Sequence, residues 1–311
     1  MIVKDKKVIF MGTPDFAVPV LESLIKETNV VLVVSQPDKK VGRHQVLEYT
    51  PVKKKALEHG IEVFQPERIR KDFEKVINTK ADIIITCAYG QIIPKEILDF
   101  PKFGCINVHA SLLPKLRGGA PLHKAIMYGE KETGITIMYM DEKMDNGDII
   151  SQEATLILDS DNVGTIHDRL SIMGAKLLIK TLPSIFNGTN ERHKQDESKV
   201  TYAYNVSREE EHIDFHNTSR DVFNHIRGLY PFPVAFAVLD NEIFKITESK
   251  LSDSIKGKPG EITEVSKDGI VVKCLDKSIL ITKLKPSGKK EMTIKDFLNG
   301  YKDELIGKRF N

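Results

Sequence analysis

Short apolar runs alternate with helical patterns through the first half of the chain. Residues 7–11, 30–35 and 82–87 are apolar and rich in β-branched side chains, which is typical of strands buried on both faces of a sheet. Residues 162–186 carry apolar side chains at steps of three and four, the spacing of an amphipathic helix. Strands that alternate with helices predict an α/β fold with a Rossmann-like, mostly parallel sheet.

The pattern changes after residue 188. Residues 189–200 are polar and charged, which is typical of a linker. Five short β-rich runs, separated by turn residues, follow between residues 235 and 284, and they predict a small OB-like β-barrel. We therefore expect an N-terminal domain over residues 1–188, a linker over residues 189–206 and a C-terminal domain over residues 207–311.

The most informative polar residues stand at the end of a strand predicted over residues 104–108. Asn107 and His109 are two residues apart, so an extended strand projects both side chains to the same face. In open parallel sheets, ligands bind at the carboxyl ends of the strands. A second predicted strand, over residues 135–140, leads into an acidic turn that contains Asp145. A donor amide, an imidazole and a carboxylate are sufficient for transfer of an acyl group to an amine.

Each of these residues also has a structural interpretation. A single histidine at a strand end more often serves packing, and Asp-Asn-Gly-Asp at residues 145–148 is a favourable turn sequence. The joint occurrence of the three residues in this order favours the catalytic interpretation. Tyr89 and Gln91 follow the strand at residues 82–87 and are further candidates for the same edge.

The charge distribution limits the kinds of partner. A formal net charge of +2 excludes a protein that binds nucleic acid over its whole surface. Residues 36–55, however, carry six Lys or Arg and two Asp or Glu, a local charge of +4. This stretch is either a solvated surface loop or a mobile arm that meets phosphate.

Other composition features concern location and metals. No apolar run approaches the ~20 residues of a membrane helix, and the first residues lack the pattern of a signal peptide, so we expect a cytoplasmic protein. Cys87, Cys105 and Cys274 are widely spaced, which indicates buried thiols and not a disulfide framework or a zinc site. The acidic turn lacks the spacing of a calcium loop, and we expect no metal.

Several stretches resemble the folate-dependent formyltransferases over essentially the whole chain. Asn-x-His-x-Ser-Leu-Leu-Pro, followed at this spacing by Asp-x-Gly-Asp, is highly specific for that family. The matching stretches are FMGTPDFAVP (10–19), QPDKKVGR (36–43), AYGQIIP (88–94), NVHASLLPKLRGGAP (107–121), ETGITIM (132–138), MDNGDII (144–150) and IRGLYPFPVAF (226–236).

The resemblance implies transfer of the formyl group of 10-formyltetrahydrofolate to the α-amine of methionine on initiator tRNA. It implies a formyltransferase catalytic domain, a C-terminal domain that helps to hold tRNA, and an arm that enters the acceptor stem with Arg43. Residues 44–48 (HQVLE) depart from the more basic continuation of the family, which affects the geometry of the arm tip. The implied catalytic residues are Asn107, His109 and Asp145, and the implied folate contacts are Ser111, Leu112, Leu113 and Pro114.

The chemistry of the reaction suits these roles. Asn107 can donate to the formyl oxygen, and one such donor is typically worth about 2.7–4 kcal/mol of barrier. His109 either stabilises the oxyanion when protonated or takes the amine proton when neutral, and a carboxylate at Asp145 would orient the ring. Two alternatives remain, a sugar-nucleotide N-formyltransferase with the same trio and a non-catalytic RNA- or folate-binding module. We expect a monomer.

Overall fold

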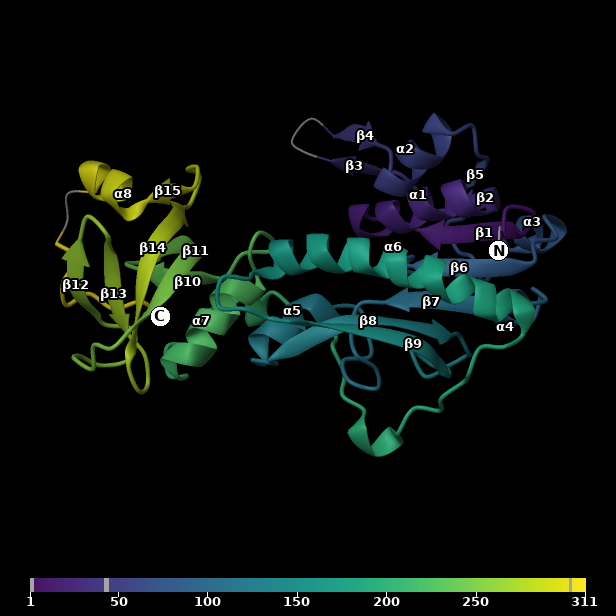
Figure 1. Ribbon diagram of the computed structural model, residues 1–311. Helices are drawn as coiled ribbons and strands as arrows, with labels where there is room; N and C mark the ends of the chain where they lie inside the picture. Colours follow the sequence, from purple (N-terminus) through teal and green to yellow (C-terminus); the bar gives the residue numbers. More distant parts are fainter. Residues whose placement is uncertain (1–2, 42–44, 302–303) are drawn as a thin grey trace. The chain divides into compact units, whose positions relative to one another are not determined.

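The computed structural model describes residues 3–41, 45–301 and 304–311, and the chain divides into two compact units (Figure 1). Unit 1 comprises Met1–Pro121, Thr133–Thr155 and His167–Tyr204. Unit 2 comprises Leu122–Glu132, Leu156–Ile166 and Asn205–Asn311. The domain boundaries expected from the sequence stay a prediction.

Unit 1 is built on a seven-stranded sheet with the strand order β5-β2-β1-β6-β7-β8-β9. The five strands from β5 to β7 pair in parallel, whereas β8 pairs with β7 in the antiparallel direction. The buried strand β6 is IIITC, a nearly unbroken apolar run, as parallel strands covered on both faces require. The strands are β1 (Lys7–Gly12), β2 (Asn29–Val34), β5 (Val63–Phe64), β6 (Ile83–Cys87), β7 (Cys105–His109), β8 (Glu132–Tyr139) and β9 (Ile149–Leu156).

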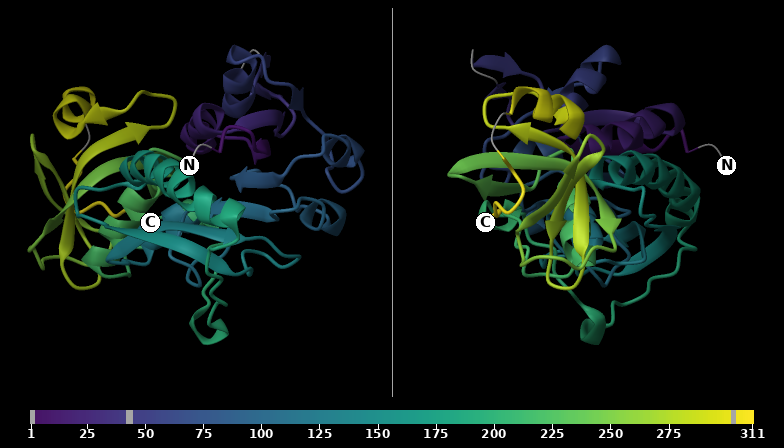
Figure 2. Two further views of the ribbon diagram at one scale, coloured as in Figure 1. Left: turned by 45° about the vertical axis from the view of Figure 1, so that its right-hand side comes forward. Right: turned by 90° about the vertical axis from the view of Figure 1, so that its left-hand side faces the viewer.

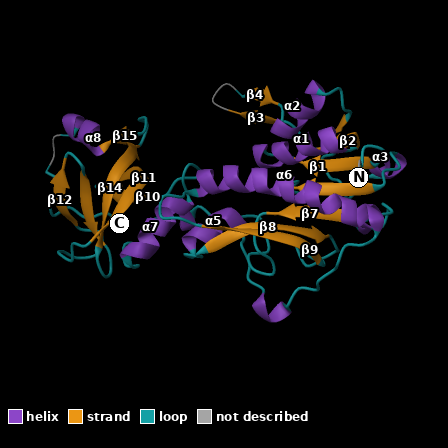
Figure 3. Ribbon diagram, in the orientation of Figure 1, coloured by secondary structure: helices purple, strands orange, loops and turns teal. Residues whose placement is uncertain are grey.

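Helices cover both faces of this sheet (Figure 3). The long helix α6 (Val163–Asn187) packs on the face that carries Val108, and a Cβ added to Gly174 would lie 2.9 Å from the Val108 side chain (Figure 1, Figure 2). On the opposite face, the Cys105 thiol contacts α4 through the Ile97 carbonyl. The other helices of unit 1 are α1 (Val18–Glu27), α2 (Pro51–Glu58), α3 (Glu74–Asn78) and α4 (Lys95–Leu98).

One predicted helix is shorter than the sequence indicates. The charged pattern over residues 66–78 predicts a helix, but α3 begins only at Glu74. The preceding residues form turns, which the Gln91 side chain holds by accepting a hydrogen bond from the Ile69 N–H (2.8 Å) and donating one to the Pro66 carbonyl (3.2 Å). A tertiary contact therefore replaces the helical hydrogen bonds that local propensity favours.

The strands β3 (Lys39–Val41) and β4 (Val46–Glu48) form a separate two-stranded hairpin within unit 1. It belongs to the basic stretch identified in the sequence. Arg43, the predicted tRNA contact, lies outside the described residues.

Unit 2 contains an antiparallel sheet with the order β10-β11-β14-β13-β12, and β15 pairs with β14. Helix α7 (Ser219–Gly228) packs on β11 and β14, and its N-terminus is capped by the Thr218 side chain, which accepts from the Asp221 N–H. The fold class predicted from the sequence, α/β followed by a smaller antiparallel β domain, is confirmed. Further elements are α5 (Pro121–Met127), β10 (Phe236–Leu239), β11 (Glu242–Ser252), β12 (Ile262–Ser266), β13 (Gly269–Lys273), β14 (Ser278–Pro286), β15 (Met292–Thr293) and α8 (Ile294–Gly300).

All three cysteines are free and buried, as predicted. Among the helices that the structure describes, none has the length and apolar composition needed to cross a membrane.

Candidate active site

Strand β7 presents Asn107 and His109 on one face of the unit 1 sheet. Asn107 pairs with Thr86 of the parallel strand β6, and His109 pairs with Thr136 of the antiparallel strand β8. Val108, between them, points to the opposite face, where it meets α6. The alternation of polar and apolar residues at the end of β7 therefore separates the candidate site from the packed side of the sheet.

The side chain of Asn107 is oriented by its neighbour on β6. The Thr86 hydroxyl donates to Asn107 Oδ1 at 2.8 Å, so the amide oxygen is already occupied. Asn107 Nδ2 has no hydrogen-bond partner in the part of the chain that the structure describes. The amide thus offers an N–H donor of fixed direction to a ligand at the carboxyl edge of the sheet.

His109 is held at one ring nitrogen and faces Asp145 with the other. Its Nε2 donates to the Leu116 carbonyl oxygen (3.1 Å), since a carbonyl can only accept. Its Nδ1 lies 3.7 Å from Asp145 Oδ2, which is an ion-pair distance and too long for a good hydrogen bond. Because the Leu116 carbonyl occupies Nε2, Nδ1 is the ring nitrogen that remains beside the carboxylate.

Asp145 stands in the turn before β9 with a φ of 49°, a left-handed conformation that aspartate tolerates better than most residues. Its Oδ2 accepts a hydrogen bond from the Gly118 N–H at 2.8 Å. Gly118 itself has a φ of 124°, and a Cβ there would lie 2.7 Å from the Ala203 carbonyl oxygen, so this position requires glycine. The structure therefore brings Asn107, His109 and Asp145 to one edge of the sheet.

The four predicted folate residues form a turn that is tied down by side chains from the sheet. The Thr136 hydroxyl donates to the Ser111 carbonyl (2.7 Å) and accepts from the Leu113 N–H (3.1 Å). Ser111 and Leu113 are buried, whereas Leu112 and Pro114 are partly exposed. Of the predicted folate contacts, the side chains of Leu112 and Pro114 are thus the accessible ones.

Tyr89 and Gln91 differ in what they leave available. The polar atoms of Gln91 hold the turn before α3. The Tyr89 hydroxyl is buried and has no hydrogen-bond partner among the described residues, and burial raises the pKa of this phenol. Only Tyr89 therefore retains an unused polar group.

The basic stretch around the hairpin offers fewer unpaired cations than the six that its sequence contains. Lys53 is bound by Asp38, and burial, which alone would raise the pKa of Asp38, is outweighed by hydrogen bonds from Lys53 and Gln65 that lower it. Lys54 pairs with Glu48, and Lys55 pairs with Glu22 and Glu58. Among the described residues, the exposed lysines of β3, Lys39 and Lys40, remain for an external partner.

Sequence reasoning missed the residues that orient the trio. Thr86 lies within an apolar strand, where a threonine is unremarkable. Gln195, which donates to the carbonyls of Asp145 and Gly147, lies in the polar stretch interpreted as a linker. Local sequence carried no signal for either role, because both depend on pairing between distant segments.

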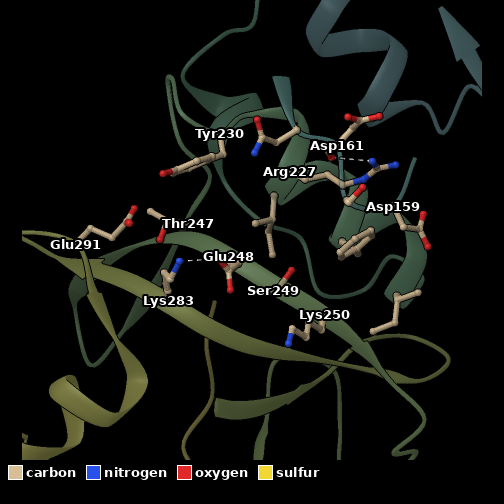
Figure 4. A pocket seen from close by; sticks show the side chains of 15 residues that line it. Asp159, Asp161, Arg227, Tyr230, Thr247, Glu248, Ser249, Lys250, Lys283 and Glu291 are labelled. Carbon is tan, nitrogen blue, oxygen red and sulfur yellow. Dashed lines mark hydrogen bonds and ion pairs between the residues drawn. The ribbon is translucent and has the colours of Figure 1, made fainter. Parts of the chain in front are cut away.

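One cavity of unit 1 lies beside the turn of Asp145, and another cavity lies in unit 2. A cavity of about 430 Å³ is lined by Lys95, Leu98, Met140 and Asn146, and therefore adjoins the turn of Asp145. The cavity of unit 2, about 470 Å³, is lined by Arg227, Tyr230, Thr247, Ser249 and Lys283 among others (Figure 4). Within the described residues, no group of three or more His, Cys, Asp or Glu side chains could hold a metal ion.

The chain belongs to the formyl transferase family. The family model described as formyl transferase matches residues 6–182, and the model of the formyl transferase C-terminal domain matches residues 205–302. Within this class, the chain belongs to the methionyl-tRNA formyltransferases. It is 50% identical over 307 residues to the methionyl-tRNA formyltransferase of Macrococcus caseolyticus, covering 98% of this chain and 99% of the relative. It is 52% identical over 299 residues to that of Bacillus subtilis, with 94% of each chain covered.

More distant solved structures share the fold. The N-formyltransferase from Helicobacter canadensis, in complex with folinic acid and dTDP-3-aminofucose, matches with a TM-score of 0.68 at 23% identity, covering 89% of this chain and 98% of that one. A variant of HypX from Aquifex aeolicus matches with a TM-score of 0.67 at 16% identity. The match covers 97% of this chain and 49% of HypX. At these identities the likeness concerns the fold alone.

Proposed function

We propose that the protein transfers the formyl group of 10-formyltetrahydrofolate to the α-amino group of methionyl initiator tRNA, and that Asn107, His109 and Asp145 carry out the transfer. The observation that supports this is the arrangement of the trio. One amide nitrogen is free, and one imidazole nitrogen faces a carboxylate at 3.7 Å, at the same edge of the sheet.

The residues divide the reaction between them. As the amine attacks the formyl carbon, negative charge develops on the formyl oxygen, and this charge is lost when the bond to the folate nitrogen breaks and the carbonyl re-forms. Asn107 Nδ2 donates to that oxygen, and Thr86 holds the donor in place without reorganisation during the reaction. His109 Nδ1 takes the proton from the amine and returns a proton to the departing nitrogen, while Asp145 stabilises the transient imidazolium. The Leu116 carbonyl keeps Nε2 protonated throughout.

The predicted folate turn and a cavity lie near the Asp145 turn. The wall of the cavity of about 430 Å³ combines Leu98, Met140 and Asn146 with charged side chains (Lys95, Asp99, Asp141, Glu142 and Lys143). This wall is more polar than that of most small-molecule pockets. We therefore place the proposed folate contact at the accessible side chains of the turn, Leu112 and Pro114.

The hairpin of β3 and β4 is the proposed contact with the tRNA acceptor stem. Its side chains Val46 and Leu47 are 63% and 57% exposed, so they are accessible to an external partner. Lys39 and Lys40 add exposed positive charge to the same hairpin. The role of Arg43, and the expectations of a monomer and of a reaction without metal, stay predictions.

A formylation assay that offers two acceptors tests this function. Purified protein and 10-formyltetrahydrofolate are incubated with methionyl initiator tRNA or with a dTDP-amino sugar, the acceptor class of the alternative enzyme. We expect formylation of the tRNA only. Activity on the sugar nucleotide alone would support the alternative, and folate or RNA binding without any transfer would support the non-catalytic module.

A further inference from the structure

A segment far along the chain, residues 195–203, lies against the turn of Asp145 and the loop after β7. Two backbone hydrogen bonds tie it to Arg117: the Arg117 N–H donates to the Thr201 carbonyl (2.9 Å), and the Ala203 N–H donates to the Arg117 carbonyl (2.7 Å). The whole arrangement belongs to unit 1. The segment is therefore part of the wall behind the candidate active site.

Gln195 is the residue of this segment that reaches Asp145. Its Nε2 donates to the backbone carbonyls of Asp145 (2.8 Å) and Gly147 (2.9 Å). Its Oε1 accepts from Arg117 Nε (3.0 Å) and Nη2 (2.9 Å). A carboxamide is the side chain that can donate twice at one end and accept twice at the other, so the position uses the full capacity of glutamine.

Arg117 provides a rigid anchor for Gln195. Its side chain is only 3% exposed, and burial of a guanidinium is costly unless its N–H groups are satisfied. Besides Gln195, it donates to Glu197, whose own side chain is 69% exposed and therefore a weaker support. The backbone bonds to Thr201 and Ala203 fix the base of the same residue.

The residues on either side of Arg117 hold the side chains of His109 and Asp145. Gly118, directly after Arg117, donates to the Asp145 carboxylate, and Leu116, directly before it, accepts from His109. The Leu116 N–H in turn donates to the Thr201 hydroxyl at 2.9 Å. His109 and Asp145 are thus held by three consecutive residues and by the segment bonded to them.

We propose that Gln195, anchored by Arg117, is a positioning residue that sets the distance between His109 and Asp145. This rests on the proposed function, because it assigns Gln195 an effect on the reaction through Asp145. Gln195 acts on the backbone of the turn and not on the substrate. A displacement of the order of 1 Å at a catalytic group can cost about a hundredfold in rate.

The test is Gln195→Glu. This variant keeps the length of the side chain and the acceptors for Arg117, but it turns a carboxylate oxygen toward two carbonyl oxygens. We expect kcat for tRNA formylation to fall by about tenfold to a hundredfold, with the KM values for folate and tRNA within about twofold of wild type. Lys194→Glu, which adds a carboxylate at the adjacent exposed position, is the matched control and should retain wild-type kcat.

A double-mutant cycle with Asp145→Asn separates positioning from a general loss of structure. If Gln195 acts through Asp145, Gln195→Glu should cost less than about twofold in the Asp145→Asn background, because the group that it positions is already inactive. Independent, multiplicative losses would overturn the proposal. So would wild-type kcat in Gln195→Glu alongside an inactive Asp145→Asn. Wild-type activity of Asp145→Asn itself would instead refute the catalytic assignment.

Thermal unfolding of each variant shows whether the fold is kept. Should Gln195→Glu not fold, Arg117→Lys replaces it, since it retains the buried cation but loses the two parallel N–H donors to Gln195. The expected result is again a lower kcat in the single variant, with almost no further loss when Asp145→Asn is also present. An additive loss would again contradict the proposal.

Discussion

The edge of the unit 1 sheet and the cavity of unit 2 use polar residues in opposite ways. At the edge, Asn107 and His109 are each bound by the protein at one end and leave the other nitrogen free. In the cavity the charged groups are bound within the protein. Lys283 pairs with Glu248 at 2.8 Å (Figure 4), and the Arg227 guanidinium donates to the backbone carbonyls of Leu158 and Asp161 and to the side chain of Asn224. Both regions contain a cavity, but their unpaired groups differ. The edge leaves the Asn107 amide N–H oriented and without a partner, whereas in the unit 2 cavity the buried hydroxyls of Thr247 and Ser249 lack a partner among the described residues.

This difference shows which feature marks a reactive site. Volume and charge are similar in the two regions, with cavities of about 430 Å³ and 470 Å³. The catalytic contribution of a polar group depends on its being fixed before the charge develops, and on its having no competing partner inside the protein. Removing a fixed and unpaired donor at the edge should therefore lower kcat, whereas changing a polar group of the unit 2 cavity should not.

The largest expected effect is on kcat in Asn107→Ala. The variant removes the free N–H donor, and loss of one such donor typically lowers kcat by about 10²–10³-fold. We expect KM and the unfolding midpoint to change little, because the Asn107 side chain makes a single hydrogen bond to Thr86. Steady-state formylation of charged tRNA measures this. A loss below about fivefold would mean that the free amide does not contact the reacting oxygen.

The sequence predicts those features of the unit 1 edge that follow from local pattern. The spacing of Asn107 and His109 predicts a shared face, and the strand ends predict a shared edge. The orientation of each group depends instead on Thr86, Leu116 and residues 195–203, which pair across the fold. Local composition does not report such contacts, and for that reason the sequence pattern predicts that Gln195 is part of a linker.

The same limit applies to the charge of the stretch that contains the β3–β4 hairpin, because its pairs are not visible in the sequence. The sequence shows a net charge of +4 over residues 36–55. In the structure Lys53, Lys54 and Lys55 are each paired with acidic side chains, so three of the six cations are occupied within the protein. Asp38 and Glu48 are already counted in the +4, and the pairing of Lys55 with two further glutamates lowers that net charge. A count of charges predicts attraction to phosphate, whereas the pairing decides how many cations are available.

A second prediction concerns two buried histidines of unit 2, His123 and His225, which are not part of the trio. Burial lowers the pKa of His123 and of His225. Below about pH 6.5 the unfolded chain binds protons that the folded chain does not. The free energy of unfolding should therefore fall as the pH is lowered, by up to about 1.4 kcal/mol per pH unit for each histidine.

Urea unfolding at pH 7.5, 6.5 and 5.5 measures this dependence, and His225→Gln removes one of the two groups. The variant should lose stability less steeply over the same interval, while its kcat at pH 7.5 stays close to wild type. An unchanged pH dependence in the variant would show that His225 titrates alike in the folded and unfolded chain. A large fall in kcat would show that His225 of unit 2 also contributes to the reaction.

The smallest expected effect comes from the cavity of unit 2. Thr247 is 7% exposed, and its hydroxyl has no hydrogen-bond partner among the residues that the structure describes. A buried hydroxyl without a partner costs about 1–3 kcal/mol, so Thr247→Val, which keeps the shape, should raise the free energy of unfolding by about 1 kcal/mol and leave kcat unchanged. Urea unfolding and the formylation assay provide the two measurements. If the variant is instead destabilised, the Thr247 hydroxyl has a hydrogen-bond partner in solution that the described residues do not supply. An unpaired Thr247 hydroxyl would then no longer be a feature that the cavity shares with the edge of unit 1, and the contrast between the two regions would be sharper.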